Sequence, residues 1–285
     1  MIRYPVKVSE LKRRINQVSK TWLQRAKART DKFRVANKYD ERSSIWSEIK
    51  VVYMKLQHNK CAYCERQLEG PRFGKIEHDL EHYRPKNAVK KWSSPHINYS
   101  TGQAWSEGYY LLAYHTLNYV TACKVCNTPL KSNYFPIAGA RGPQRDNPRH
   151  LRSEKPFLIY PLGRIDKDPE TLITFDGILP VPKGHWGHRF RRGMVTLEFF
   201  QLHRRETLLK QRAEQIRALW FALMILESNL DQNAKEFAAN TIKQLTSRAT
   251  PHCNCTRSFL ALYQHNYPKA KAIAVGVKEF LNSLM

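Results

Sequence analysis

The N-terminal part of the chain carries apolar side chains at helical spacing. Leu11 and Ile15 lie four positions apart, and Ile49 and Val52 repeat a similar interval further along. Such spacing collects apolar side chains on one face, so it predicts two amphipathic helical stretches. The polar segment 28–44 between them is expected to form a loop or a frayed helix.

The pattern changes twice in the middle of the chain. Residues 75–83 alternate between apolar and polar types, which predicts a short strand. Residues 87–108 are rich in Gly, Ser, Asn and Pro and are expected to be irregular. Residues 156–182 contain short apolar runs broken by Pro, Gly and Asp, as in short strands joined by turns.

The C-terminal part returns to helical spacing, with a long helix predicted over residues 204–228. The pattern as a whole predicts an α+β protein that is mostly helical. We expect an N-terminal helical arm over 1–57, a metal-binding module over 58–140, and a C-terminal extension over 141–285 in which short strands precede helices.

The net charge of the chain indicates which class of partner it is expected to bind. Lys and Arg total 48 against 24 acidic residues, giving a formal net charge of +24, while 42% of residues are hydrophobic. Such a surface attracts the phosphate backbone of nucleic acid. A generally basic, solvated surface is the plainer alternative, and an anionic membrane surface is less favoured because no separate basic amphipathic stretch occurs.

No apolar run reaches the length of a membrane-spanning helix, and the first residues lack the apolar segment of an export signal. We therefore expect a cytoplasmic protein without a membrane partner. In that setting, paired cysteines indicate metal or redox chemistry more than disulfides.

Four of the six cysteines form two Cys-x-x-Cys pairs, Cys61 with Cys64 and Cys123 with Cys126. Two such pairs commonly supply four thiolates to a tetrahedral Zn²⁺ ion, and a closed shell of that kind is structural. Redox chemistry is the alternative, but one active pair would not need a second. The remaining cysteines, in the stretch 252–255 ("HCNC"), are expected to be free thiols or a partial metal site with the adjacent histidine.

Between the two pairs lies the stretch "EHDLEHYRPK", residues 77–86. Hydrolysis of a phosphodiester needs a base to activate water and a cation to stabilise charge on the phosphate. A neutral histidine can serve as the base. Both His78 and His82 follow a glutamate, and alternation along a strand places them on one face. Their positions along the chain distinguish the two histidines. His82 is followed by Tyr-Arg-Pro-Lys at the expected end of the strand, so it is the expected base. His78 lies earlier in the strand and is expected to have a supporting role.

The order of these motifs, "CAYCER", "HYRPK", "YYLLAYHTLNYVTACKVCN" and the later "EKPFLIYPLGRIDKDPETLITFDGILP", resembles the HNH endonucleases with a zinc-stapled ββα-metal fold. Within these, it is similar to the PtuB-type nucleases associated with retron and Septu anti-phage defence. The similarity extends over most of residues 45–215.

The resemblance implies a role for each matching position. His82 matches the general base, Glu81 the adjacent metal ligand, and Asn118 the middle residue that holds the base-bearing loop. Asn127 matches the last position, a second ligand of the catalytic ion. Three basic residues match phosphate-contacting positions: Arg84, Lys86 and Lys131. Asn118 could instead simply cap a helix or turn.

The resemblance further implies a metal-dependent endonuclease acting on nucleic acid, DNA above all, with Mg²⁺, Mn²⁺ or Ni²⁺ as the catalytic ion beside the structural Zn²⁺. It implies a defence-system ATPase of the ABC or SMC-like class as partner, resembling PtuA, and in retron systems a reverse transcriptase with its RNA–DNA. The competing hypothesis is a zinc-stapled nucleic-acid-binding module without catalysis.

Overall fold

The computed structural model describes residues 1–284 and consists of helices with two small antiparallel sheets. The first sheet pairs β1 (His78–His82) with β2 (Tyr119–Cys123), so that His82 lies opposite Tyr119 and His78 opposite Cys123. The second pairs β3 (Ile173–Asp176) with β4 (Leu179–Pro182). This architecture confirms the α+β prediction, the strand within 75–83 and the short strands within 156–182.

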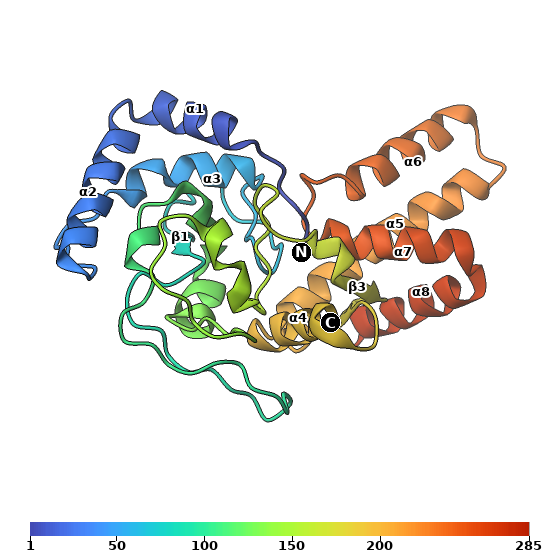
Figure 1. Ribbon diagram of the computed structural model, residues 1–285. Coiled ribbons are helices and arrows are strands. Elements are labelled where there is room, and N and C mark those ends of the chain that lie inside the picture. Colours follow the sequence, from blue (N-terminus) through green and yellow to red (C-terminus); the bar gives the residue numbers. More distant parts are fainter. Residues whose placement is uncertain (285) are drawn as a thin grey trace.

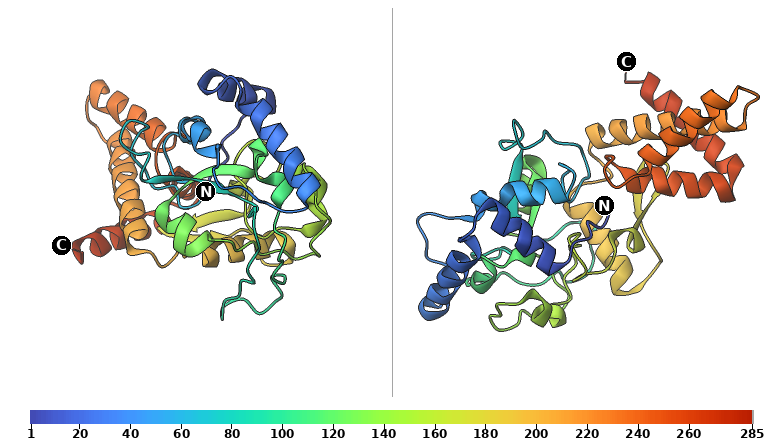
Figure 2. Two further views of the ribbon diagram at one scale, coloured as in Figure 1. Left: turned by 90° about the vertical axis from the view of Figure 1, so that its left-hand side faces the viewer. Right: turned by 90° about the horizontal axis from the view of Figure 1, so that it is seen from above.

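The long helices lie in two groups (Figure 1). The N-terminal group comprises α1 (Val8–Val18), α2 (Trp22–Ala36) and α3 (Lys50–Leu56). The C-terminal group comprises α4 (Gly187–Phe199), α5 (Glu206–Glu227), α6 (Gln232–Leu245), α7 (Cys253–His265) and α8 (Tyr267–Asn282). The view from above in Figure 2 separates α1–α3 from α5–α8 in the same way.

Short helical turns connect these elements. They are η1 (Trp46–Ile49), η2 (Tyr110–Leu112), η3 (Thr116–Asn118), η4 (Cys126–Lys131), η5 (Pro148–Glu154) and η6 (Pro169–Thr171). Residues 87–108 form no helix or strand, as their turn-rich composition predicts. No helix among residues 1–284 combines the length and apolar character needed to cross a membrane.

In the polar segment 28–44, expected to form a loop or a frayed helix, α2 continues as far as Ala36 and residues 37–44 form no helix or strand. Phe33 on this helix is buried, and its ring stacks on Tyr114 with 6.1 Å between centroids. On the exposed side Asp31 forms ion pairs with Lys27 and with Arg34. Tertiary burial of one aromatic residue, supported by exposed charge pairs, therefore sustains a helix that the polar sequence alone does not indicate.

Buried apolar residues form two clusters. The larger one runs from the N-terminal helices through β1 and β2 to α4, so that Leu11, Trp22 and Tyr119 belong to one core. The smaller one joins α5, α7 and α8 through residues such as Ile216, Phe259 and Val277. The strand pair of the candidate site lies inside the larger cluster, which fixes its surroundings on several sides.

Candidate functional site

Four cysteine sulfurs meet at one end of the β1–β2 pair. Cys61 and Cys64 lie in the turn after α3, Cys123 ends β2, and Cys126 begins η4. All four are buried, and their Sγ atoms lie within 4.8 Å of one another. The backbone N–H of Ala62 donates to the carbonyl of Thr121 at 3.0 Å, which fixes the first turn against β2.

These residues could hold a metal ion such as zinc. A tetrahedral site with Zn–S bonds of about 2.3 Å requires sulfurs about 3.8 Å apart. The Sγ atoms of Cys64 and Cys123 are separated by 3.9 Å, close to that value. Within residues 1–284 this is the one cluster of Cys, His, Asp and Glu with such geometry.

Arg205 contacts the cysteine cluster from a distant part of the chain. Its Nη1 lies 3.2 Å from Sγ of Cys126, just before α5 begins. A guanidinium in this position offsets part of the negative charge that four thiolates would bring to a bound cation. No spacing along the chain indicates this contact, because 79 positions separate the two residues.

His82 ends β1 and lines a pocket of about 300 Å³ whose other lining residues are mostly polar. Its Nε2 lies 3.0 Å from the carbonyl oxygen of Ala113. A carbonyl can only accept, so Nε2 carries the proton and Nδ1 keeps its lone pair. Within residues 1–284 Nδ1 has no hydrogen-bond partner, and it is not fully enclosed by protein. The basic nitrogen is therefore open to the pocket.

The surroundings keep His82 neutral. Burial lowers the pKa of its imidazole to about 3, and the nearby Lys86 ammonium contributes to the same shift. The ring packs edge-on against Trp46 and Tyr119, with centroids 4.8 Å and 5.0 Å away. These contacts fix the ring plane, so the orientation of Nδ1 is set before any ligand arrives.

Glu81 lies beside His82 and lines the same pocket. Its Oε1 is 3.1 Å from Nζ of Lys131, and both side chains are buried. Burial raises the pKa of the Glu81 carboxyl, and Lys131 opposes that shift. The carboxylate expected to hold a cation is thus already neutralised by an ammonium in this structure.

Asp79 joins this group, although no motif along the chain singles it out. It lies two positions before Glu81 on β1, hence on the same face of the strand. Its Oδ2 accepts a hydrogen bond from Nδ2 of Asn127 at 2.9 Å, and its Oδ1 pairs with the ammonium of Lys124. Alternation from Glu81 was the one sequence signal that could have identified it.

Asn118 is fully buried and holds the chain just beyond His82. Its Oδ1 accepts from the backbone N–H of Arg84 at 2.8 Å, and its Nδ2 donates to the carbonyls of Arg84 and Leu112 at 3.0 and 3.1 Å. Leu112 directly precedes Ala113, whose carbonyl accepts from His82. Asn118 therefore connects both segments that position the imidazole, and it does not line the pocket.

The three residues expected to contact phosphate occupy different environments. Arg84 is buried, and its Nε lies 3.1 Å from Oε2 of Glu154. Lys131 is buried against Glu81. Lys86 lines the pocket, with its ammonium 4.9 Å from the ring centre of Trp46. In this conformation only Lys86 of the three presents its charge to the His82 pocket.

The remaining candidates lie away from this pocket. His78 is buried at the other end of β1, and its Nε2 bonds to the carbonyl of Glu69 at 3.0 Å. Cys253 and Cys255 are buried free thiols. Within residues 1–284 neither cysteine belongs to a metal-ligand cluster, so the structure supports the free-thiol alternative over a partial metal site with His252.

The class defined by these observations is a small α+β protein in which a cluster of four cysteines lies beside a strand pair and a buried histidine. The chain is similar to the Septu protein PtuB of Bacillus mycoides (strain KBAB4), at 29% identity over 168 residues, 58% of this chain. It spans about half of the relative's length, 50%. No family-wide profile and no solved structure matches the chain.

Proposed function

We propose that the protein is a metal-dependent HNH endonuclease that hydrolyses phosphodiester bonds of nucleic acid, most readily DNA. The observation that carries the proposal is the set orientation of His82, which is neutral and has Nδ1 open to a polar pocket beside Lys86. In this role Nδ1 takes a proton from the attacking water, and Nε2 stays bonded to Ala113. A phosphate anion bound beside the ring would raise the pKa of the imidazole and strengthen it as a base.

Lys86, Glu81 and Asn127 would support the same reaction. The Lys86 ammonium would contact the phosphate, because it faces the pocket without a carboxylate partner among residues 1–284. Glu81 and Asn127 offer the oxygen donors that Mg²⁺ and Mn²⁺ prefer, and the ion they hold would stabilise charge on the leaving oxygen. Lys131 would keep Glu81 ionised before the ion binds. The expected products carry 5′-phosphate and 3′-hydroxyl ends.

The four cysteines would hold a structural Zn²⁺ in this proposal. Four buried thiolates leave no position for water on the ion, so the metal would stabilise the strand pair and take no part in catalysis.

The proposal is tested by His82→Ala, with His96→Ala as the matched control because His96 is exposed and outside the pocket. Loss of a general base lowers cleavage by about 100-fold or more. We expect that loss in His82→Ala alone, measured as nicking of plasmid DNA with Mn²⁺, with zinc content unchanged. The melting temperature of His82→Ala should fall modestly, because the buried ring and its hydrogen bond to Ala113 are lost. Cleavage by His82→Ala at the rate of the His96→Ala control would place the base elsewhere.

A second candidate function is nucleic-acid binding without catalysis. The observation in its favour is the Glu81–Lys131 pair, in which an ammonium already neutralises the carboxylate. This function predicts that unaltered protein binds DNA but never cuts it with any divalent ion, and that His82→Ala binds equally well.

We also propose, from the similarity to the Septu protein, a role in anti-phage defence with an ATPase of the ABC or SMC-like class as partner. A retron reverse transcriptase with its RNA–DNA is a further proposed partner.

A further inference from the structure

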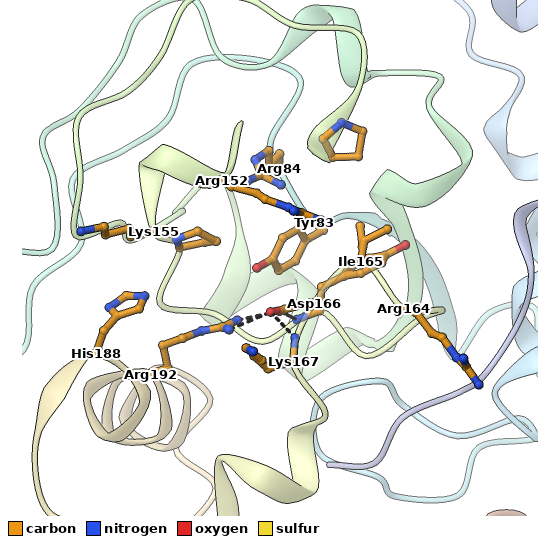
Figure 3. Close-up of a pocket in the computed structure, with 13 residues that line it drawn as sticks. Tyr83, Arg84, Arg152, Lys155, Arg164, Ile165, Asp166, Lys167, His188 and Arg192 are labelled. Carbon is orange, nitrogen blue, oxygen red and sulfur yellow. Dashed lines mark hydrogen bonds and ion pairs between the residues drawn. The ribbon is translucent and has the colours of Figure 1, made fainter. Parts of the chain in front are cut away.

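A second pocket, of about 440 Å³, lies on the other side of the segment that follows His82. Tyr83 and Arg84 line this pocket, whereas His82, Pro85 and Lys86 line the pocket described above. The two pockets share no lining residue. The second pocket is shown in Figure 3 and is called the basic pocket below.

Positive charge dominates the lining of the basic pocket. Its basic residues are Arg84, Arg152, Lys155, Arg164, Lys167 and Arg192, and its one carboxylate is Asp166. Arg192 donates to both oxygens of Asp166, at 2.7 and 2.6 Å. The backbone N–H groups of Tyr160 and Lys167 also donate to this carboxylate, at 2.9 and 2.6 Å. Both oxygens of the Asp166 carboxylate therefore accept hydrogen bonds from the protein. A carboxylate paired in this way repels an incoming anion less than a free one would.

Four of these six basic residues have no carboxylate partner. Arg84 pairs with Glu154, and Arg192 pairs with Asp166. The other four, Arg152, Lys155, Arg164 and Lys167, form no ion pair within residues 1–284 and are exposed. Figure 3 places Arg152 and Lys155 on one side of the Arg192–Asp166 pair, and Arg164 extends toward the edge of the view. Four cations without a carboxylate partner thus line one hollow, and all of them would attract an anion bound there.

The rest of the lining suits a compact ligand with an unsaturated or ring portion. The half-buried Ile165 and Pro156 form its apolar surface, and the buried rings of Tyr83 and Tyr160, with centroids 4.9 Å apart, lie directly behind it. The hydroxyl of Tyr83 donates to the carbonyl of Leu158 at 2.6 Å, which fixes its ring. The volume lies in the range of about 300–1,000 Å³ that is usual for small-ligand sites.

We propose that the basic pocket binds a small polyphosphorylated anion of the nucleoside triphosphate class. The several negative charges of a triphosphate match the unpaired cations, and the apolar wall accommodates the nucleoside. A nucleic-acid strand spreads one charge per nucleotide along a continuous groove, whereas these cations surround a single hollow. The proposal concerns binding and does not depend on cleavage at His82.

The test is calorimetric titration of the full chain with ATP, GTP and inorganic triphosphate at near-physiological salt without divalent ions. The variant is Lys155→Ala with Lys167→Ala, and the matched control is Lys243→Ala with Lys271→Ala. Each removes two exposed lysines that form no ion pair within residues 1–284, so net charge falls equally. Loss of two charged contacts weakens binding by about tenfold or more.

We expect saturable binding at one site for ATP or GTP, weakened about tenfold in the pocket variant and less than about twofold in the control. Three results would overturn the proposal: no saturable binding, equal weakening in both variants, or displacement of the nucleotide by a single-stranded oligonucleotide. Binding of inorganic triphosphate as tight as that of ATP would reject the nucleoside part of the assignment. Circular dichroism melting of both variants confirms that these exposed substitutions leave the fold intact.

Discussion

At the scale of single residues, the candidate site is set by hydrogen bonds to main-chain carbonyls. His82 donates to Ala113, and Asn118 donates to the neighbouring Leu112. Both side chains thus rest on one short segment before β2. Small shifts of that segment would rotate the imidazole, so residues that never touch a substrate govern its orientation.

Asn118→Ala would test this dependence. The change leaves the N–H and the carbonyl of Arg84 without partners and removes one of the two donors to the Leu112 carbonyl, which destabilises the fold by about 2–3 kcal/mol. We expect a lower urea midpoint and reduced cleavage without loss of DNA affinity. Asn87→Ala, at an exposed position, is the control and should leave all three unchanged. If the Asn118→Ala protein were as stable as the control, Asn118 would not be needed to connect the two segments that position the His82 imidazole.

Two histidines, the half-buried His115 and the buried His252, also predict an acid-sensitive fold. Burial lowers the pKa of His115 to about 4 and that of His252 to about 3, below the usual value of about 6.5. At a pH above that usual value both histidines are neutral in the folded and in the unfolded chain, so they make no contribution to the change of stability with pH. Below it the unfolded chain takes up protons that the folded chain excludes, so stability falls as pH drops toward the folded pKa values, by up to about 1.4 kcal/mol per pH unit per histidine.

Urea unfolding at neutral pH and again about two pH units lower measures this effect. The unaltered protein should lose stability over that interval, and His115→Asn should lose less. Equal losses in the two proteins would show that His115 does not set the acid response.

At the scale of elements, the cysteine cluster joins the turn after α3 to the end of β2 and the start of η4. Three segments meet there, and none of them is long enough to be stable alone. A bound metal ion would hold them together and fix the register that places His82 opposite Tyr119.

Metal removal should therefore loosen this region selectively. With a strong chelator, or in Cys64→Ser, we expect faster amide hydrogen exchange in β1, β2 and α3, and little change in α5 and α8, which belong to the second core. Cys255→Ser is the matched control, since Cys255 is buried but outside the cluster, and it should keep the same zinc content as the unaltered chain. If chelation increased amide hydrogen exchange equally in all helices and strands, a local stabilising role of the metal would be contradicted.

At the scale of the whole molecule, the defence role can be tested in cells. Bacteria carrying the gene with its neighbouring genes should resist phage plating, and His82→Ala should abolish that resistance while His96→Ala retains it. Undiminished protection by His82→Ala would mean that strand scission at this site is not required for defence.

The parts of the fold that depend on local pattern could be predicted from the sequence. Alternation located β1, and the spacing of Cys61, Cys64, Cys123 and Cys126 predicted a cluster that the structure brings together. Whether residues 28–36 form a loop or a frayed helix could not be decided from the sequence, because the helix is stabilised by Phe33 packing on Tyr114 in a distant part of the chain. A pattern of residue types reflects neighbours along the chain and carries no information about such distant partners.

The same limit explains what was missed at the site. Arg84 and Lys131 look like surface cations in the sequence, yet each is buried against a carboxylate, and Glu154 lies 70 positions from Arg84. The basic pocket combines residues from 83 to 192, and nothing in the quoted stretches "HYRPK" and "EKPFLIYPLGRIDKDPETLITFDGILP" indicates that their residues line one pocket. Buried ion pairs and composite pockets arise from the folded arrangement and become visible only there.

The contact between Arg205 and Cys126 has a practical consequence for anyone trimming this protein. A fragment ending near residue 140 would contain the strand pair and all four clustered cysteines and would look self-sufficient. It would lack the guanidinium that offsets the sulfur charge, as well as Glu154, the buried partner of Arg84. The smallest fragment that retains both must extend through Arg205, to the first turn of α5.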